Sequence, residues 1–100
     1  MKIGIYAVRD NKVNGFMQPM FLLSEGVARR SFTDAINGDK NGLFYKYPGD
    51  FDLYSLGSFD DQTGELIAET PRNLCNGSSL VIADQDMVAG RNGSGPLQVR

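Results

Sequence analysis

The sequence of 100 residues contains no histidine and one cysteine, Cys75. Without histidine or a cysteine cluster, it lacks the ligands of zinc-type metal sites and the base of a histidine-dependent catalytic triad. A single cysteine also excludes an internal disulfide. These absences remove most enzyme classes, and we predict a protein that is not an enzyme, with no catalytic residue, no metal site and no cofactor.

Glycine-rich phosphate loops are missing as well. The chain has neither a GxGxxG nor a GxxxxGK[ST] signature, and its glycine-rich residues 90–95 lack the preceding strand and following helix that such loops need. The acidic residues 60–65 supply oxygen ligands without the spacing of a calcium loop. Asp50 and Asp52 share a strand face, but nothing supplies a neighbouring general acid or pocket for hydrolysis. We therefore interpret these segments as a tail, a turn and a strand.

Long hydrophobic runs and a strong charge excess are also lacking. No apolar run approaches about 18 residues, and no signal segment follows the opening Met-Lys-Ile, so we expect a cytosolic, reduced protein without a membrane partner. Ten basic and twelve acidic residues give a net charge of −2, which does not by itself predict nucleic-acid binding. The length suits one domain with a small core, to which a dimer would add buried surface.

The chain does contain one segment with a clear helical period, residues 24–37. Ser24 is a favourable N-cap, and Gly38 can adopt the left-handed conformation that ends many helices. The apolar residues of this segment recur at a spacing that places them on one side, so we predict a helix packed on a sheet. The residues expected on its buried side are Val27, Ala28, Phe32, Ala35 and Ile36.

Strand patterns precede and follow this helix. Residues 1–8 and 51–59 alternate with a period of two, and the apolar residues 16–23 and residues 65–70 each follow a turn. Pro19 has no N–H, so the second strand should lie at a sheet edge or be broken at a bulge. The order predicts an α+β fold (ββαββ) with a four-stranded, mainly antiparallel sheet, a central first strand and one helix on one face. The helix should pack on Ile3, Ile5, Leu53 and Leu66, which leaves Tyr6, Val8 and Tyr54 on a bare face.

The composition changes after this pattern ends. Residues 1–71 should form the ββαββ domain, and residues 72–100 a tail rich in glycine, asparagine and serine that is flexible toward its end. Within the tail, residues 80–83 would add a short strand or dock on a partner. The bare sheet face and the apolar edge at residues 16–23 predict a symmetric homodimer.

One combination of basic and aromatic residues survives as a candidate site. Arginines on the exposed side of the helix and aromatics in the loop at residues 38–50 could together neutralise phosphates and stack on unpaired bases. The same residues also fit a structural role, with an Arg30–Asp34 ion pair, a solvated Arg29 and aromatics that cap the core. The candidate nucleic-acid-binding residues are Arg29, Arg30, Tyr45, Lys46 and Tyr47.

Four stretches resemble a known family: the opening Met-Lys-Ile-x-Ile-Tyr-Ala-Val-Arg-Asp, residues 18–21, residues 30–37, and residues 47–64 with their Leu-Gly-Ser-Phe-Asp-Asp-x-Thr-Gly turn. Together they are similar to the small nonstructural protein of gokushovirus-type microviruses, which are single-stranded DNA phages. The resemblance covers roughly residues 1–70. It implies a protein of the host cytoplasm that is absent from the virion and acts in genome replication, by binding single-stranded DNA or by switching synthesis to single-stranded product.

A second function remains open at this point. The chain could be a regulator that docks on a viral or host replication protein and never contacts DNA. Its acidic residues would repel phosphates and suit a basic partner surface, although they also fit a solvated strand edge. The residues on which this alternative rests are Asp50, Asp52, Asp60, Asp61 and Glu65.

Overall fold

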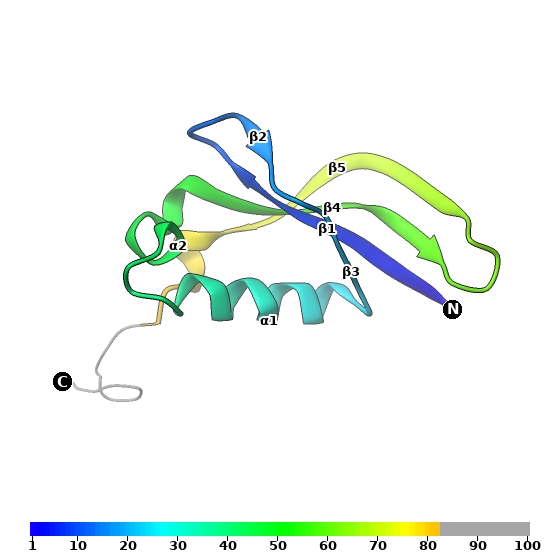
Figure 1. Ribbon diagram of the computed structural model, residues 1–100, viewed down its shortest axis with the longest axis horizontal. Coiled ribbons are helices and arrows are strands. Elements are labelled where there is room, and N and C mark those ends of the chain that lie inside the picture. Colours follow the sequence, from blue (N-terminus) through cyan, green and yellow to red (C-terminus); the bar gives the residue numbers. More distant parts are fainter. Residues whose placement is uncertain (83–100) are drawn as a thin grey trace.

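The computed structural model describes residues 1–82 and has the predicted α+β fold, with one main helix along one face of a twisted sheet (Figure 1). All strand pairs are antiparallel, in the order β2-β1-β4-β5, with β3 paired to the same side of β1 as β2. The first strand is therefore central, as predicted. Within the described part of the chain, no helix is long and apolar enough to span a membrane.

The strands are β1 (Lys2–Asp10), β2 (Gly15–Phe16), β3 (Met20–Leu22), β4 (Phe51–Asp60) and β5 (Leu66–Asn76). The helices are α1 (Glu25–Ile36), α2 (Leu43–Lys46), η1 (Pro48–Asp50) and η2 (Gly77–Leu80).

The predicted second strand is divided into β2 and β3, which gives the sheet five strands. Both pieces pair with β1, and residues 17–19 between them leave the ladder. The Met17 N–H still donates to the Val8 carbonyl at 2.8 Å, whereas Pro19 has no N–H to donate. The prediction of an edge strand interrupted at Pro19 is confirmed.

Helix α1 begins as predicted but ends differently. The Ser24 hydroxyl accepts a hydrogen bond from the Val27 N–H at 3.2 Å, which confirms the N-cap. The prediction of a left-handed Gly38 is wrong, because Gly57 and Gly64 are the glycines with positive φ in the described residues. Asn37 closes the helix instead: its side-chain amide donates to the Thr33 carbonyl at 2.8 Å and to the Leu80 carbonyl at 2.9 Å.

The helix covers the opposite face of β1 from the one predicted. Val8 pairs with Leu53, and both are buried beneath α1, whereas Leu66 is 64% exposed. The predicted assignment of Ile3 and Ile5 to the helix side is therefore wrong. Alternation separates the two faces of a strand but does not say which one meets a helix. The buried core consists of Tyr6, Val8, Ala28, Phe32, Ile36, Phe51 and Leu53, while Val27 and Ala35 are half-buried.

A bulge in β4 changes the side to which its residues point. Ile5 pairs with Gly57 and Tyr6 with Ser55, so Leu56 is an extra residue. Gly57 has φ of 145°, and a Cβ there would collide with the Ile67 carbonyl oxygen, so glycine is required. The predicted alternation holds up to Ser55 and is reversed after the bulge.

Strand β5 continues beyond the predicted domain boundary at residue 71. Ser55 pairs with Arg72 and Gly57 with Ala68, so residues 69–71 bulge out of the ladder and Pro71 needs no N–H there. Leu80 then ends η2, and residues 81–82 do not lie in a strand. The rest of the predicted tail, residues 83–100, lies outside the described residues.

Candidate nucleic-acid interface

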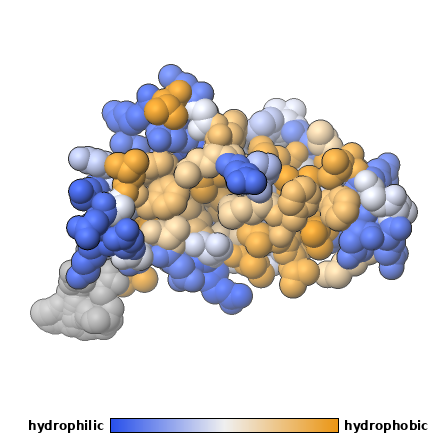
Figure 2. All heavy atoms as spheres, in the orientation of Figure 1, coloured by the Kyte–Doolittle hydropathy of each residue, from blue (hydrophilic) through white to orange (hydrophobic). Residues whose placement is uncertain are grey.

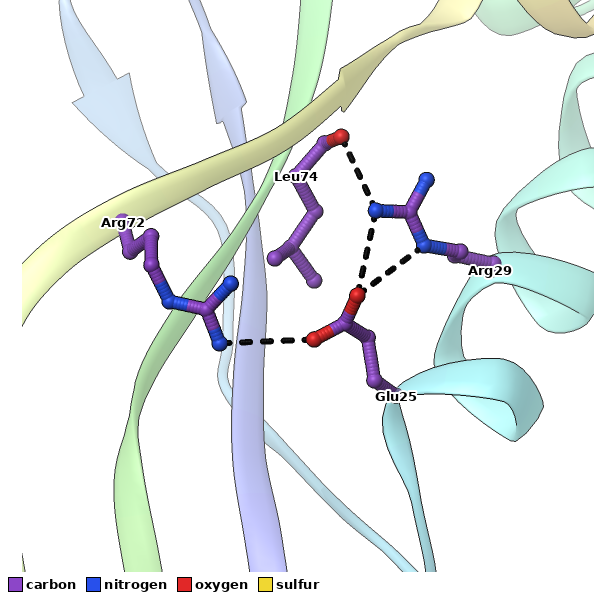
Figure 3. A network of polar contacts seen from close by, with 4 residues as sticks. All are labelled: Glu25, Arg29, Arg72 and Leu74. Atoms are coloured by element: carbon purple, nitrogen blue, oxygen red, sulfur yellow. Dashed lines mark hydrogen bonds and ion pairs between the residues drawn. The ribbon is translucent and has the colours of Figure 1, made fainter.

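Arg29 connects α1 to β5 rather than pointing freely to solvent (Figure 3). Its Nη2 lies 3.1 Å from Glu25 Oε2 and donates to the Leu74 carbonyl at 3.2 Å, while Arg72 approaches the other carboxylate oxygen of Glu25 at 3.3 Å. Hydrogen bonds from Arg29 and then Arg72 lower the pKa of Glu25. This carboxylate between two guanidinium groups stabilises the contact of α1 with β5, and a phosphate would have to compete with it for Arg29.

The other predicted site residues lie in two separate places. Arg30 is exposed in the second turn of α1, and among residues 1–82 it forms no ion pair, so the predicted pair with Asp34 is not found. Tyr45 is half-buried in α2, and Lys46 and Tyr47 are exposed there, near the C-terminal end of α1 (Figure 1). Six residues of helix, roughly 9 Å, separate Arg30 from that end. The structure thus places Arg30 on a different element from Lys46 and its two neighbouring tyrosines.

The aromatic residue next to them, Phe44, belongs to the core. Its ring meets Phe32 and Phe51 edge to face, with centroid separations of 6.1 and 4.6 Å. The predicted aromatic loop is in fact the pair of short helices α2 and η1, and Phe44 closes one end of the core between α1 and β4. The structural interpretation of this segment holds for Phe44, whereas Tyr47 remains 55% exposed.

A different surface gathers four aromatic side chains, of which Phe16 and Phe21 are exposed and Tyr54 and Phe59 are half-buried. It is the side of the sheet opposite α1, which carries no helix of residues 1–82 and is here called the helix-free face. Tyr6 and Val8 point toward α1, so the odd-numbered residues of β1 point to the helix-free face. Paired residues of antiparallel strands point to the same face, so the partners of these odd-numbered residues also lie on the helix-free face. Phe16 and Tyr54 meet edge to face with ring centroids 5.1 Å apart, and Phe21 and Phe59 do so at 5.7 Å. The pairs that define the face are Arg9–Phe16, Ala7–Tyr54, Ile5–Phe21 and Ile3–Phe59.

Two irregularities in the sheet create this surface. Phe16 and Phe21 are five residues apart, and so are Tyr54 and Phe59, which would place the members of each set on opposite faces of a regular strand. The break at residues 17–19 and the bulge at Leu56 each reverse the alternation of the residues that follow, so all four rings lie on one side of the sheet. The sequence analysis placed Tyr54 on the bare face correctly, but the other three rings could not be assigned without knowledge of the break and the bulge.

A polar network holds a cation beside these rings. The guanidinium carbon of Arg9 lies 6.0 Å from the centroid of the Phe16 ring. Nη1 of the same arginine donates a hydrogen bond to Asn11 Oδ1 at 2.5 Å. The Asn11 amide donates to Asp52 at 2.8 Å, and the Asn76 amide donates to the other oxygen of Asp52 at 2.8 Å. The network crosses β1, β4 and β5 and positions Arg9, which forms no direct ion pair among residues 1–82.

The acidic residues do not form one patch. Asp52 lies at one end of β4 and Asp60 at the other, roughly 26 Å apart for eight residues of strand. At the far end, the N-terminal ammonium lies 3.8 Å from Asp60 and 2.9 Å from Asp61. A backbone hydrogen bond from Gln62 lowers the pKa of Asp60, and the Asp61 hydrogen bond raises the pKa of the ammonium. The positive charge of the ammonium therefore neutralises part of the negative charge of the two carboxylates at that end.

Comparisons with known proteins give one match. The family model described as "Phage ORF5 protein" matches residues 3–80, which cover all the strands and helices described above except Lys2, the first residue of β1. No curated protein and no solved structure matches the chain. The match extends past residue 71 through β5 and η2, in agreement with a folded unit that is longer than the predicted domain.

Proposed function

This chain belongs to the phage ORF5 protein family, and we propose that it binds single-stranded DNA, without catalysis, during phage genome replication in the host cytoplasm. The resemblance to the nonstructural protein of gokushovirus-type microviruses supports a role of this kind, because those phages package single-stranded genomes. The binding surface that we propose is the helix-free face rather than the residues selected from the sequence.

The observation that carries the proposal is the placement of four aromatic rings on the side of the sheet that no helix of residues 1–82 covers. The four residues are Phe16, Phe21, Tyr54 and Phe59. Base–aromatic stacking contributes about 1–3 kcal/mol per base and tolerates any sequence, because every base has an aromatic face. Antiparallel sheets with exposed aromatics bind unpaired bases in this way in other nucleic-acid-binding folds. Phe16 and Phe21 are 46% and 50% exposed, so their rings are accessible to a ligand.

The polar end of the same face suits the rest of a nucleotide. Arg9 can contact a phosphate, and the amide group of the exposed Asn73, which pairs with Tyr54, can hydrogen-bond to base edges. Each phosphate contact contributes about −0.7 to the logarithmic salt slope on single strands. With Arg9 as the cation of this face, we propose binding in which stacking contributes more than charge, which is compatible with a net charge of −2.

The test is a fluorescence anisotropy titration of the full chain with a labelled 30-residue single strand. Binding at low salt that weakens only gradually with added salt supports the proposal, and a duplex of the same length should bind less, because its bases are already stacked. Absence of binding to the single strand at low salt contradicts it.

The second candidate function is docking on a viral or host replication protein without DNA contact. The observation in its favour is the acidic β4–β5 turn, where Asp61 and Glu65 are exposed. Recovery of a replication protein from infected cells after nuclease treatment, and its loss with Asp61→Asn, would support docking. Recovery of single-stranded genome alone would support DNA binding.

A further inference from the structure

The two edges of the sheet differ in protection against pairing with another chain. Strand β5 carries Glu69, Pro71 and Arg72 and is bulged at two places, and such features prevent edge-to-edge pairing. The other edge, residues 15–23, contains no charged side chain, and we call it the β2–β3 edge. Its one proline lies outside the paired residues of β3, and no strand of residues 1–82 pairs with the outer side of β3.

Apolar surface continues from this edge toward the helices. Met17 and Leu23 are 46% and 63% exposed. Met17 and Phe44 line two hollows, one of 220 Å³ between the edge and α1 and one of 350 Å³ beside α2. In the view of Figure 2, hydrophobic residues gather across the middle of the molecule and hydrophilic residues at its two ends. A contiguous apolar surface of this kind marks an interaction site.

The charge distribution of the β2–β3 edge indicates which partner binds there. In a symmetric two-fold interface each patch meets a copy of itself, so a charged residue close to the axis faces its own copy, and like charges directly opposite one another on paired strands are destabilising. The β2–β3 edge has no charge to repel its own copy, and the one charged residue in the walls of the two hollows is Asp10. A basic or acidic partner would find no complementary charges there. A second copy of this chain therefore matches the edge better than a charged partner does.

We propose that two copies pair antiparallel through β3, Met20–Leu22 against Met20–Leu22, to form one continuous sheet. A two-fold axis perpendicular to the sheet keeps both α1 helices on one side and both helix-free faces on the other. Phe21 borders this edge and contacts Phe59, so the aromatic pairs of the two copies become neighbours across the axis. The inference rests on the proposed function only where it takes the joined helix-free faces of the two copies as one DNA-binding surface. The dimer itself depends only on the edge.

Sedimentation equilibrium of the full chain tests the dimer and its location. At micromolar concentration we expect twice the chain mass of 11.0 kDa. Leu23→Lys places a lysine charge on the pairing edge, just beyond Leu22, and such a charge opposes edge-to-edge pairing, so this variant should have the mass of one chain. Leu66→Lys is the matched control, because Leu66 is 64% exposed but lies beyond Phe59 on the helix-free face, away from β3, and it should remain dimeric. Circular dichroism checks that both variants fold.

A crosslink tests the register. In a Cys75→Ser background, Phe21→Cys should form an intermolecular disulfide under mild oxidation, because paired antiparallel residues have Cβ atoms about 4.5–5.5 Å apart. Leu66→Cys in the same background should remain a free thiol.

Two results would overturn the inference: a wild-type chain that sediments only as a monomer, or a dimer that Leu66→Lys dissociates and Leu23→Lys does not. A wild-type monomer that still binds the 30-residue strand overturns the dimer alone. A β3 dimer without DNA binding overturns the proposed function alone.

Discussion

Phe16 and Tyr54 meet edge to face across an intervening strand, with ring centroids 5.1 Å apart. They belong to β2 and β4, which flank β1, and the β1 residue paired with Tyr54 is Ala7. Ala7 is fully buried although none of the helices in residues 1–82 lies on its side of the sheet. A small residue in the central strand thus allows the two rings to approach one another above it, and they form the middle of the proposed stacking surface.

Replacement of Tyr54 by leucine should weaken binding of single-stranded DNA. Leucine retains apolar bulk over Ala7 but removes the ring, and the loss of about 1–3 kcal/mol of stacking corresponds to a roughly 5- to 150-fold higher Kd. The measurement is anisotropy with the labelled 30-residue strand. Tyr47→Leu is the matched control, since Tyr47 is 55% exposed but lies at the end of α2. A larger effect from Tyr47→Leu would return the site to the residues chosen from the sequence.

Replacement of Arg9 by glutamine should reduce the salt dependence of binding. Glutamine can still hydrogen-bond to Asn11, but it removes the charge beside Phe16. If Arg9 contacts one phosphate, the slope of log K against log salt should become less negative by about 0.7. Arg30→Gln, a change to an exposed helix cation, should leave the slope unchanged. An equal change in slope for both variants would mean that the charge effect is nonspecific.

Replacement of Phe32 by alanine should cost about 3–5 kcal/mol of unfolding free energy, because the side chain is 2% exposed at the centre of the core. That is a large part of the stability of a domain of this size. Urea denaturation followed by circular dichroism gives the value. Phe21→Ala is the control, and its half-exposed ring should contribute less. Equal costs for the two variants would contradict the burial assigned to the helix.

Much of this architecture could be predicted from local patterns. The N-cap at Ser24, the helical period that buries Phe32, and the edge position of Pro19 are short-range signals, and each holds in the structure. The face of β1 that meets α1 was assigned wrongly, because alternation separates the two faces of a strand without indicating which of them a helix covers. A Cβ at Gly4 would collide with the ring of Tyr6, so this glycine leaves room for Tyr6 on the helix side.

The site was harder to predict than the fold. Its aromatics share one face only because of the break in the β2–β3 segment and the bulge at Leu56, and a bulge depends on pairing between distant strands. Arg29 likewise looked solvated on a helical wheel, because its contact with the Leu74 carbonyl depends on a strand 45 residues away. Contacts between residues far apart in the sequence thus determine both the shared face of the aromatics and the surroundings of Arg29.

The Glu25 ion pairs should give the stability a dependence on pH. Arg29 and Arg72 lower the pKa of Glu25 below its ordinary value of 4.5. The stabilisation is therefore fully present above about pH 4.5 and is lost as the pH falls through the lowered value. Urea midpoints of wild type and Glu25→Gln should differ at pH 7 and converge in acid. A difference that stays constant from pH 7 into acid would show that the carboxylate charge is not the cause.

Two glycine substitutions should change stability in opposite directions. Gly57→Ala forces a side chain into the Ile67 carbonyl at a φ of 145°, so it should disrupt the β4–β5 pairing and lower the unfolding free energy. Gly26→Ala is at an exposed position in α1, where an added Cβ would lie 3.8 Å from Ser24 Oγ, an ordinary contact, so it should raise stability by about 0.5–1 kcal/mol. Thermal melts of the two variants give both signs. A neutral Gly57→Ala would contradict the bulge.

The most direct test of the proposed site is a titration of the isotope-labelled protein with unlabelled single-stranded DNA, followed by amide chemical shifts. The helix-free face predicts that the largest changes fall on β1, β2 and β4 around Arg9, Phe16, Tyr54 and Phe59, while residues 29–30 and 45–47 change little. Large changes confined to α1 and α2, with an unperturbed helix-free face, would contradict the account.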